Sequence, residues 1–145
     1  MEQQTPAAGR VARGLAFGGL VTLTSAAVRV GCDGAALSRR AAACVPLRPP
    51  SWVFGVVWPA LYVTTGLAWA RAPRALDARF AAVTALCCAW LVVYLCARAR
   101  RTAALVLLAA TACAAALARR ASGALPLALW LAFATYLNAA DVLKC

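Results

Sequence analysis

The side chains with the most distinctive chemistry in this sequence are aromatic rings that recur at helical spacing. Trp58, Tyr62, Thr65 and Trp69 follow one another at intervals of four, three and four residues, so a helix would carry them on one face. Such a face offers flat apolar surfaces for stacking, together with a phenol and a hydroxyl that can form hydrogen bonds. This combination is typical of a pocket for a flat, hydrophobic ligand.

Two further groups of aromatic residues follow later in the chain. Trp90 and Tyr94 lie one helical turn apart. Another coherent face is formed by Trp130, Phe133, Ala134, Leu137 and Asn138. An amide inside an apolar segment needs hydrogen-bond partners, so we favour interhelical hydrogen bonding for Asn138 over direct contact with a ligand.

The depth of each tryptophan leaves two interpretations open. Trp52 and Trp69 lie near the ends of an apolar segment and fit the belt that Trp forms at membrane interfaces. Trp58, Trp90 and Trp130 lie deeper, where an indole N–H needs a partner, so their rings should face the interior of a helix bundle. There they could pack as ordinary core residues or form the walls of a ligand pocket, and their spacing does not separate these two roles.

Other kinds of reactive site have little support in the sequence. The chain has no histidine, and its seven cysteines lack the spacing of metal ligands, so we expect no metal site and no catalytic residues. Cys32 and Cys44 share one loop and could pair in an oxidising space, although we favour two free thiols. Four cysteines fall inside apolar segments, where they should behave as small apolar residues: Cys87, Cys88, Cys96 and Cys113.

The elements that must position the rings follow from the distribution of charge. Hydrophobic residues make up 65% of the 145 residues and charged residues 13%, and the mean hydropathy is +0.80. Five segments without Lys, Arg, Asp or Glu are 15 to 20 residues long, close to the length that crosses a bilayer. The sequence therefore predicts an all-α integral membrane protein, a bundle of five transmembrane helices. The prediction comprises a polar tail at 1–10, one domain at 11–143, spans at about 11–28, 51–70, 80–97, 102–118 and 121–140, and a long first loop at 29–50.

The net charge of +11 reflects arginines at the ends of the spans. No basic run is long enough to follow a phosphate backbone, so we expect a lipid membrane as partner and no nucleic acid. Seven basic residues fall on one side of the membrane and eight on the other, which predicts no orientation. Two stripes of small residues at four-residue spacing predict close helix packing and a homodimer interface, respectively: Gly14, Gly18 and Thr22, then Ala81, Ala85 and Ala89.

The stretch PPSWVFGVVWPALYVTTGLAWA, residues 49–70, resembles the second-helix signature of the TspO/MBR family. This is the family of the tryptophan-rich sensory protein and the translocator protein, also called the peripheral-type benzodiazepine receptor. The matching residues are Pro49, Pro50, Trp52, Phe54, Trp58, Leu61, Tyr62, Gly66 and Ala68. The stretch PLALWLAFATYLN is similar to the family's fifth helix through Pro126, Trp130, Phe133, Ala134, Leu137 and Asn138. The resemblance covers about residues 11–143.

This resemblance implies a bundle of five transmembrane helices, usually homodimeric, with a ligand cavity beneath the first loop. Family members bind porphyrins and other tetrapyrroles, sterols and benzodiazepine-type compounds. The resemblance therefore implies that this protein can bind a porphyrin or haem-type ligand, and it implies no obligatory cofactor. They occupy the mitochondrial outer membrane in animals and the cytoplasmic membrane in bacteria. Carried over by position, Pro49 and Pro50 would set the entry to the second span. The cavity would be lined by Trp58, Tyr62, Trp90, Trp130, Phe133, Ala134 and Leu137.

The chain departs from the family pattern at several positions. Val45 and Leu47 stand in the first loop where the family has Pro and Trp, and Cys87 stands where the third helix has Asn. After the fifth span, Ala139 and Ala140 do not supply the tyrosine and basic residue of the family's sterol-recognition segment. The sequence therefore favours tetrapyrroles over sterols as ligands.

Three functions remain as hypotheses. We favour a membrane receptor or carrier that binds flat hydrophobic ligands and has a transport or regulatory role. The second is light-dependent degradation of porphyrin, in which Trp58 and Trp90 would donate electrons to the excited ligand. The third is a structural or regulatory membrane partner whose pocket is vestigial.

Overall fold

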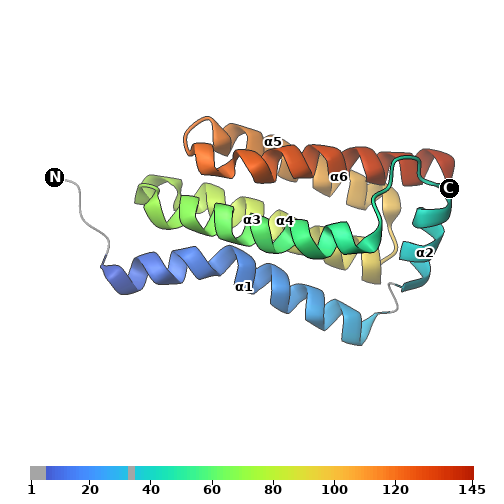
Figure 1. The fold of residues 1–145 in the computed structure, drawn as a ribbon, viewed down its shortest axis with the longest axis horizontal. Helices are drawn as coiled ribbons and strands as arrows, with labels where there is room; N and C mark the ends of the chain where they lie inside the picture. The colour runs from blue at the N-terminus through green and yellow to red at the C-terminus, as the bar shows by residue number, and fades with distance from the viewer. Residues whose placement is uncertain (1–5, 33–34) are drawn as a thin grey trace.

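A computed structural model of the protein describes residues 6–32 and 35–145, and every long element in these ranges is a helix (Figure 1). Five helical stretches are long and apolar enough to cross a membrane, which confirms the predicted fold class. The five are α1 (Ala7–Gly31), α3 (Ser51–Arg71), the run of η1 (Arg74–Leu76), α4 (Asp77–Leu91) and η2 (Val92–Cys96), α5 (Arg100–Ala118), and the run of η3 (Ser122–Ala124) and α6 (Leu125–Lys144).

The helices extend a few residues beyond the predicted spans at several ends. The first begins at Ala7 rather than near residue 11, the third begins at Arg74 rather than near residue 80, and the fifth continues to Lys144. Charged residues in these extensions can reach the headgroups while the backbone keeps its helical hydrogen bonds. Absence of charge therefore marks the hydrocarbon-crossing part of each helix rather than its whole length.

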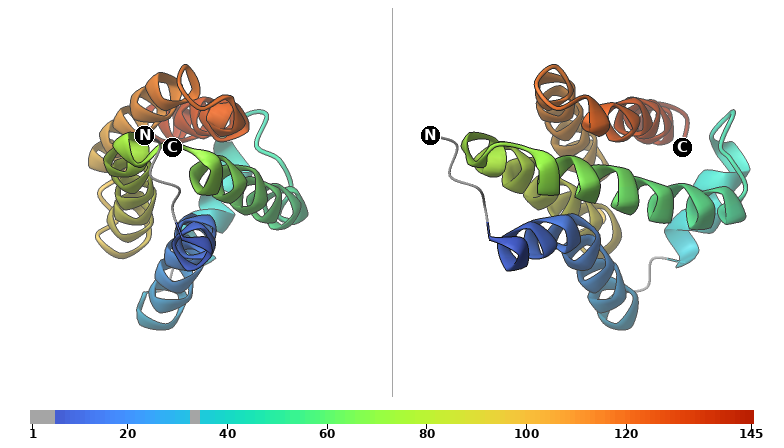
Figure 2. Two further views of the ribbon diagram at one scale, coloured as in Figure 1. Left: turned by 90° about the vertical axis from the view of Figure 1, so that its left-hand side faces the viewer. Right: turned by 60° about the vertical axis from the view of Figure 1, so that its left-hand side comes forward.

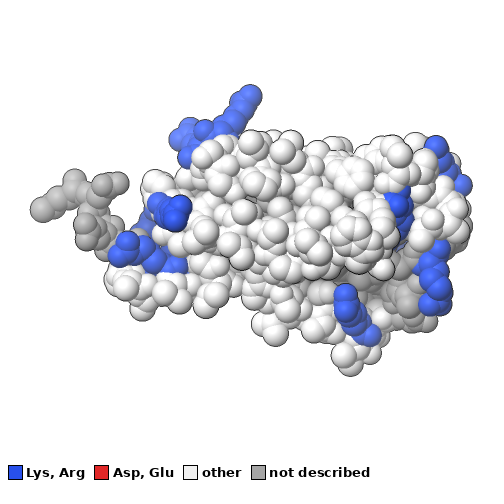
Figure 3. All heavy atoms as spheres, viewed as in Figure 1, with Lys and Arg blue, Asp and Glu red and all other residues white. Residues whose placement is uncertain are grey.

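Consecutive spans run antiparallel and close into a ring of neighbours. The helix α1 packs on α3 and α4, α5 packs on α4 and α6, and α3 contacts α6. The end-on view in Figure 2 places α5 and α6 on one side of the bundle and α1 on the opposite side. Figure 3 shows Lys and Arg toward the two ends of the molecule, with a largely uncharged surface between them on the face in view, as expected of a membrane-spanning bundle.

The contact between α1 and α3 is made close by glycines. A Cβ added to Gly66 would overlap the backbone carbonyl oxygen of Gly14, and one added to Gly18 would lie 3.0 Å from the Cβ of Tyr62. Gly14 itself is less crowded, since a Cβ there would lie 3.6 Å from both the Cβ of Ala70 and the Gly66 oxygen. The predicted stripe of small residues thus meets α3 at Gly14 and Gly18.

The first loop contains a helix that the sequence analysis did not predict, α2 (Ala35–Cys44), which lies across the end of the bundle where the chain also ends (Figure 1). Ala41 and Val45 are buried there against Leu137 and Ala140 of α6. Leu47, which follows, has a φ of 61° and is 81% exposed. The loop therefore forms a packed cover on this end of the bundle.

Two disulfide bonds fasten this cover to the bundle, and they correct our prediction for the cysteines. Cys32 pairs with Cys96, with a Cα–Cα distance of 5.2 Å, and Cys44 pairs with Cys145, with a Cα–Cα distance of 6.1 Å. The thiols of Cys32 and Cys44 are neither free nor joined to each other, and Cys96 is not simply a small apolar residue. Cys32 is the C-cap residue of α1 and Cys44 is the last residue of α2, and each is bonded to a cysteine from a distant segment.

A polar cluster at the opposite end corrects our prediction for Trp69. The ring of Trp69 is 7% exposed and stacks on Phe80 at 5.3 Å between centroids. Its indole Nε1 donates a hydrogen bond of 2.8 Å to Oδ1 of Asp77, which also forms an ion pair of 2.6 Å with Nη2 of Arg13. Trp69 is thus a core residue that joins α3 to α4, and not a member of an interfacial belt.

Candidate functional site

The aromatic face of α3 points toward α1 and the interior. Trp58 and Tyr62 lie 6.1 Å apart between ring centroids, and Tyr62 meets Phe17 of α1 edge-on at 6.1 Å. Phe17 is fully buried, whereas Trp58 and Tyr62 remain partly exposed beside the core. Pro59 follows Trp58 inside the helix without ending it, because α3 continues to Arg71.

The aromatic face of α6 meets α3 at Phe54, which lies one helical turn before Trp58. We call these side chains the series of rings: Phe54, Trp58, Tyr62, Trp90, Trp130 and Phe133. Trp130 packs edge-on against Phe54 of α3 at 5.6 Å and lies 5.6 Å from Phe133. Phe133 in turn stacks on Tyr136 at 6.2 Å, and the hydroxyl of Tyr136 donates a hydrogen bond to the carbonyl oxygen of Pro46. The rings of α6 therefore connect the middle of the bundle with the loop that covers its end.

The third span joins this arrangement through a hydrogen bond inside the membrane region. The indole Nε1 of Trp90 donates to Oδ1 of Asn138 at 2.8 Å, and Nδ2 of Asn138 donates to the carbonyl oxygen of Arg100 at 3.3 Å. Trp90 also stacks on Tyr94 at 5.4 Å. Asn138 thus links α4, α5 and α6.

The aromatic residues predicted to line a cavity fall into three groups of contacting rings, Trp58 with Tyr62, Trp90 with Tyr94, and Trp130 with Phe133, and the exposure of the predicted residues differs. Leu137 is 5% exposed and belongs to the small core beneath α2. Pro49 and Pro50 directly precede α3, with Pro50 as its N-cap residue. The hydroxyl of Thr65 is buried and has no hydrogen-bond partner among the described residues. The partly buried members of the predicted set are Trp58, Tyr62, Trp90, Trp130, Phe133 and Ala134.

The predicted dimer stripe lies on the outside of the chain. Ala81 and Ala85 are exposed and Ala89 is partly buried. This stripe is accessible for a helix–helix contact with another copy, and self-association through it stays a prediction.

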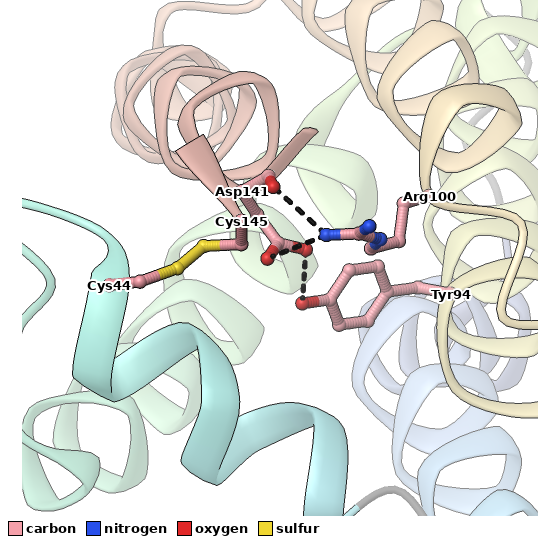
Figure 4. Close-up of a disulfide and its surroundings, with 5 residues drawn as sticks. All are labelled: Cys44, Tyr94, Arg100, Asp141 and Cys145. Carbon is pink, nitrogen blue, oxygen red and sulfur yellow. Dashed lines mark hydrogen bonds and ion pairs between the residues drawn. A yellow bond between two sulfur atoms is a disulfide. The ribbon is translucent and has the colours of Figure 1, made fainter. Parts of the chain in front are cut away.

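A charged cluster at the covered end was missed by the sequence analysis (Figure 4). Asp141 is 3% exposed, accepts a hydrogen bond of 3.1 Å from the hydroxyl of Tyr94, and lies 3.4 Å from Nη1 of Arg100. The guanidinium of Arg48 lies 5.5 Å from the ring centroid of Phe54. The signal in the sequence was Asp141 itself, one of only four acidic residues in the chain.

The same cluster contains a set of potential metal ligands. The donor atoms of Cys44, Asp141 and Cys145 lie within 4.8 Å of one another. The two sulfurs are bonded to each other, so they are not available as thiolate ligands while the disulfide is closed. A soft or borderline cation could use this set only after reduction, which releases two thiols.

At the other end of the bundle, a groove of about 580 Å³ runs between α3 and the connection from α5 to α6. Arg71 and Arg120 lie at its rim, and Leu67 and Pro126 line its apolar part. None of the aromatic residues described above lines this groove. The groove and the series of rings are therefore separate features.

Comparison with known proteins identifies the group to which the chain is related. The family model of the TspO/MBR family matches residues 14–143, from within α1 to near the end of α6, and so reaches all five spans and the covering loop. A search of curated proteins gives no match. The family match agrees with the two helix signatures and with the five-helix bundle. The protein therefore belongs to the TspO/MBR family.

Proposed function

We propose that the protein is a membrane receptor or carrier that binds flat hydrophobic ligands at its series of aromatic rings. Porphyrins and related tetrapyrroles are the preferred class, and the binding serves a transport or regulatory role. The observation that carries this proposal is the partial exposure of Trp58, Tyr62, Trp90 and Trp130, which come from three different helices. Phe17 and Phe80 are 0% and 1% exposed and have no free ring surface, whereas these four rings keep surface that a flat ligand could contact.

The chemistry around the rings favours an anionic flat ligand over a neutral one. Arg48 stacks over Phe54, and Phe54 contacts Trp130, so a cation lies at the covered end of the series. A tetrapyrrole could stack its macrocycle on the rings and direct its propionate groups toward this guanidinium. A sterol has no comparable anionic group, which supports the preference for tetrapyrroles.

The test is quenching of tryptophan fluorescence by protoporphyrin in nanodiscs, measured in the dark. Trp130→Leu should weaken saturable binding about tenfold, because a ring contact contributes up to about 1.5 kcal/mol. Trp52→Leu is the matched control, since Trp52 is 68% exposed and is not among the residues proposed to contact the ligand. Equal binding by the two variants would mean that Trp130 only packs between helices, and the proposal would be wrong.

The same samples separate the other two hypotheses. Under light, loss of porphyrin absorption beyond a protein-free control would favour photochemical degradation over simple binding. Absence of saturable binding in a dimeric, correctly folded protein would favour the structural or regulatory partner. Binding in the dark without loss of porphyrin under light is the result that we expect.

A further inference from the structure

The groove at the end opposite α2 combines a charged rim with an apolar floor. Its rim carries Arg71, at the end of α3, and Arg120, in the connection between α5 and α6. Ser122 lies beside them. The floor descends along α3 toward Thr64, seven residues before Arg71, which corresponds to about 10 Å along a helix. The groove thus starts at the end of a span and enters the part of the bundle that the hydrocarbon surrounds.

The two arginines at the rim have no acidic partner among the described residues. Arg71 and Arg120 are both exposed. The two described carboxylates are engaged elsewhere, since Asp77 pairs with Arg13 and Asp141 pairs with Arg100. Both arginines line the same groove without a described counter-charge, so the groove should attract an anion. Arginine is well suited to a phosphate group because it donates in a planar fork.

The apolar floor decides which kind of anion fits. Leu67 is 49% exposed and lies on the floor together with Pro126, below the level of the arginines. A soluble anion would contact only the rim and would leave this surface bare. An amphiphile with an anionic head and a hydrocarbon chain would satisfy both parts, since the head would meet the arginines and the chain would cover Leu67.

We propose that this groove binds an anionic glycerophospholipid, with its phosphate between Arg71 and Arg120 and the first part of an acyl chain along the floor. The site is independent of the series of aromatic rings, which lies outside the groove. The lipid would be a bound partner of the protein in addition to the bulk bilayer.

Native mass spectrometry of the full chain with added phosphatidylglycerol or phosphatidylcholine tests the proposal. Phosphatidylglycerol should bind more tightly than phosphatidylcholine. Substitution of both rim residues, Arg71→Gln with Arg120→Gln, should weaken phosphatidylglycerol binding on the order of 30-fold, from about 1 kcal/mol for each arginine. The matched control is Arg74→Gln with Arg119→Gln, which removes the same charge from exposed positions at the same end that do not line the groove. The control should change the affinity less than threefold.

Three results would overturn the proposal. Equal losses in the two double variants would mean that the lipid responds to the general charge of this end. Displacement of the lipid by glycerol phosphate at equal concentration would mean that the apolar floor contributes nothing. A dimer that dissociates only in the groove variant would mean that a second copy of the chain covers the groove. Unfolding titrations of both variants would exclude loss of fold as the cause of weaker binding.

Discussion

The contact between Gly14 and Gly66 allows a sharp test of how the bundle is held together. Replacing Gly66 with alanine adds one methyl group that would overlap the carbonyl oxygen of Gly14 and lie 3.3 Å from its carbonyl carbon. These are backbone atoms, so no side-chain rotation can relieve the overlap. We expect α1 and α3 to move apart, and the packing along their interface to loosen.

The magnitude follows from comparison with the reciprocal substitution. Overpacking of this kind costs about 1–3 kcal/mol. Gly14→Ala adds the same methyl group to the same interface, but its nearest neighbours lie at 3.6 Å, an ordinary van der Waals distance. Both substitutions gain similar helix propensity, about 1 kcal/mol at most. The free energies of unfolding of the two variants should therefore differ by about 2 kcal/mol, or roughly 30-fold in the unfolding equilibrium, with Gly66→Ala the less stable.

Unfolding in mixed micelles with increasing sodium dodecyl sulfate, followed by far-UV circular dichroism, measures this difference. Gly14→Ala should unfold at or above the midpoint of the unmutated protein, and Gly66→Ala clearly below it. If the two variants unfolded together, or if Gly66→Ala were the more stable, α1 and α3 would not pack through these glycines as described.

Three further predictions concern the covered end of the bundle. Replacing Cys44 and Cys145 with serine should lower the free energy of unfolding by about 2–4 kcal/mol under non-reducing conditions, because the disulfide joins positions 101 residues apart; no change would mean that these thiols are unpaired. Leu47→Gly should raise the free energy of unfolding by about 1 kcal/mol, since the φ of 61° is unfavourable for leucine, whereas Leu47→Ala should have little effect. Asn138→Leu should cost about 1–2 kcal/mol because the Trp90 N–H loses its acceptor, and a double-mutant cycle with Trp90→Phe should show coupling of at least 0.5 kcal/mol.

The sequence was sufficient to predict the five spans and the faces that carry their aromatic residues. Both follow from local rules, since a span needs a continuous apolar segment and a helix face repeats every three or four residues. Gly14 and Gly18 could be assigned to a helix contact for the same reason. The identity of the facing atoms could not be predicted, because periodicity shows which face is used and not which helix lies opposite.

The features that were missed depend on contacts between distant segments. Trp69 lies near the end of its span, which suggested an interfacial position, but Asp77 returns after the turn and accepts its indole hydrogen bond. The pairing of Cys32 and Cys44 looked plausible because they are close in sequence, but each is bonded to a cysteine from a distant segment, Cys96 or Cys145. The first loop contains charged residues, and no helix was predicted in it. It still forms α2, because α6 buries small side chains of this segment such as Ala41.

The two disulfides have a consequence for the sidedness of the protein in its membrane. Both lie at the end of the bundle that α2 covers, whereas the free cysteines, Cys87, Cys88 and Cys113, lie within the spans. Stable disulfides form in oxidising compartments, so we expect the α2 end to face such a compartment and the start of α1 to face the reducing side.

The nearly equal arginine counts could not indicate this orientation, which would place the groove in the leaflet on the reducing side of the membrane. If that side is the cytoplasm, its leaflet carries the anionic lipids that give a membrane its negative surface potential, and the groove would open where its proposed ligand is abundant.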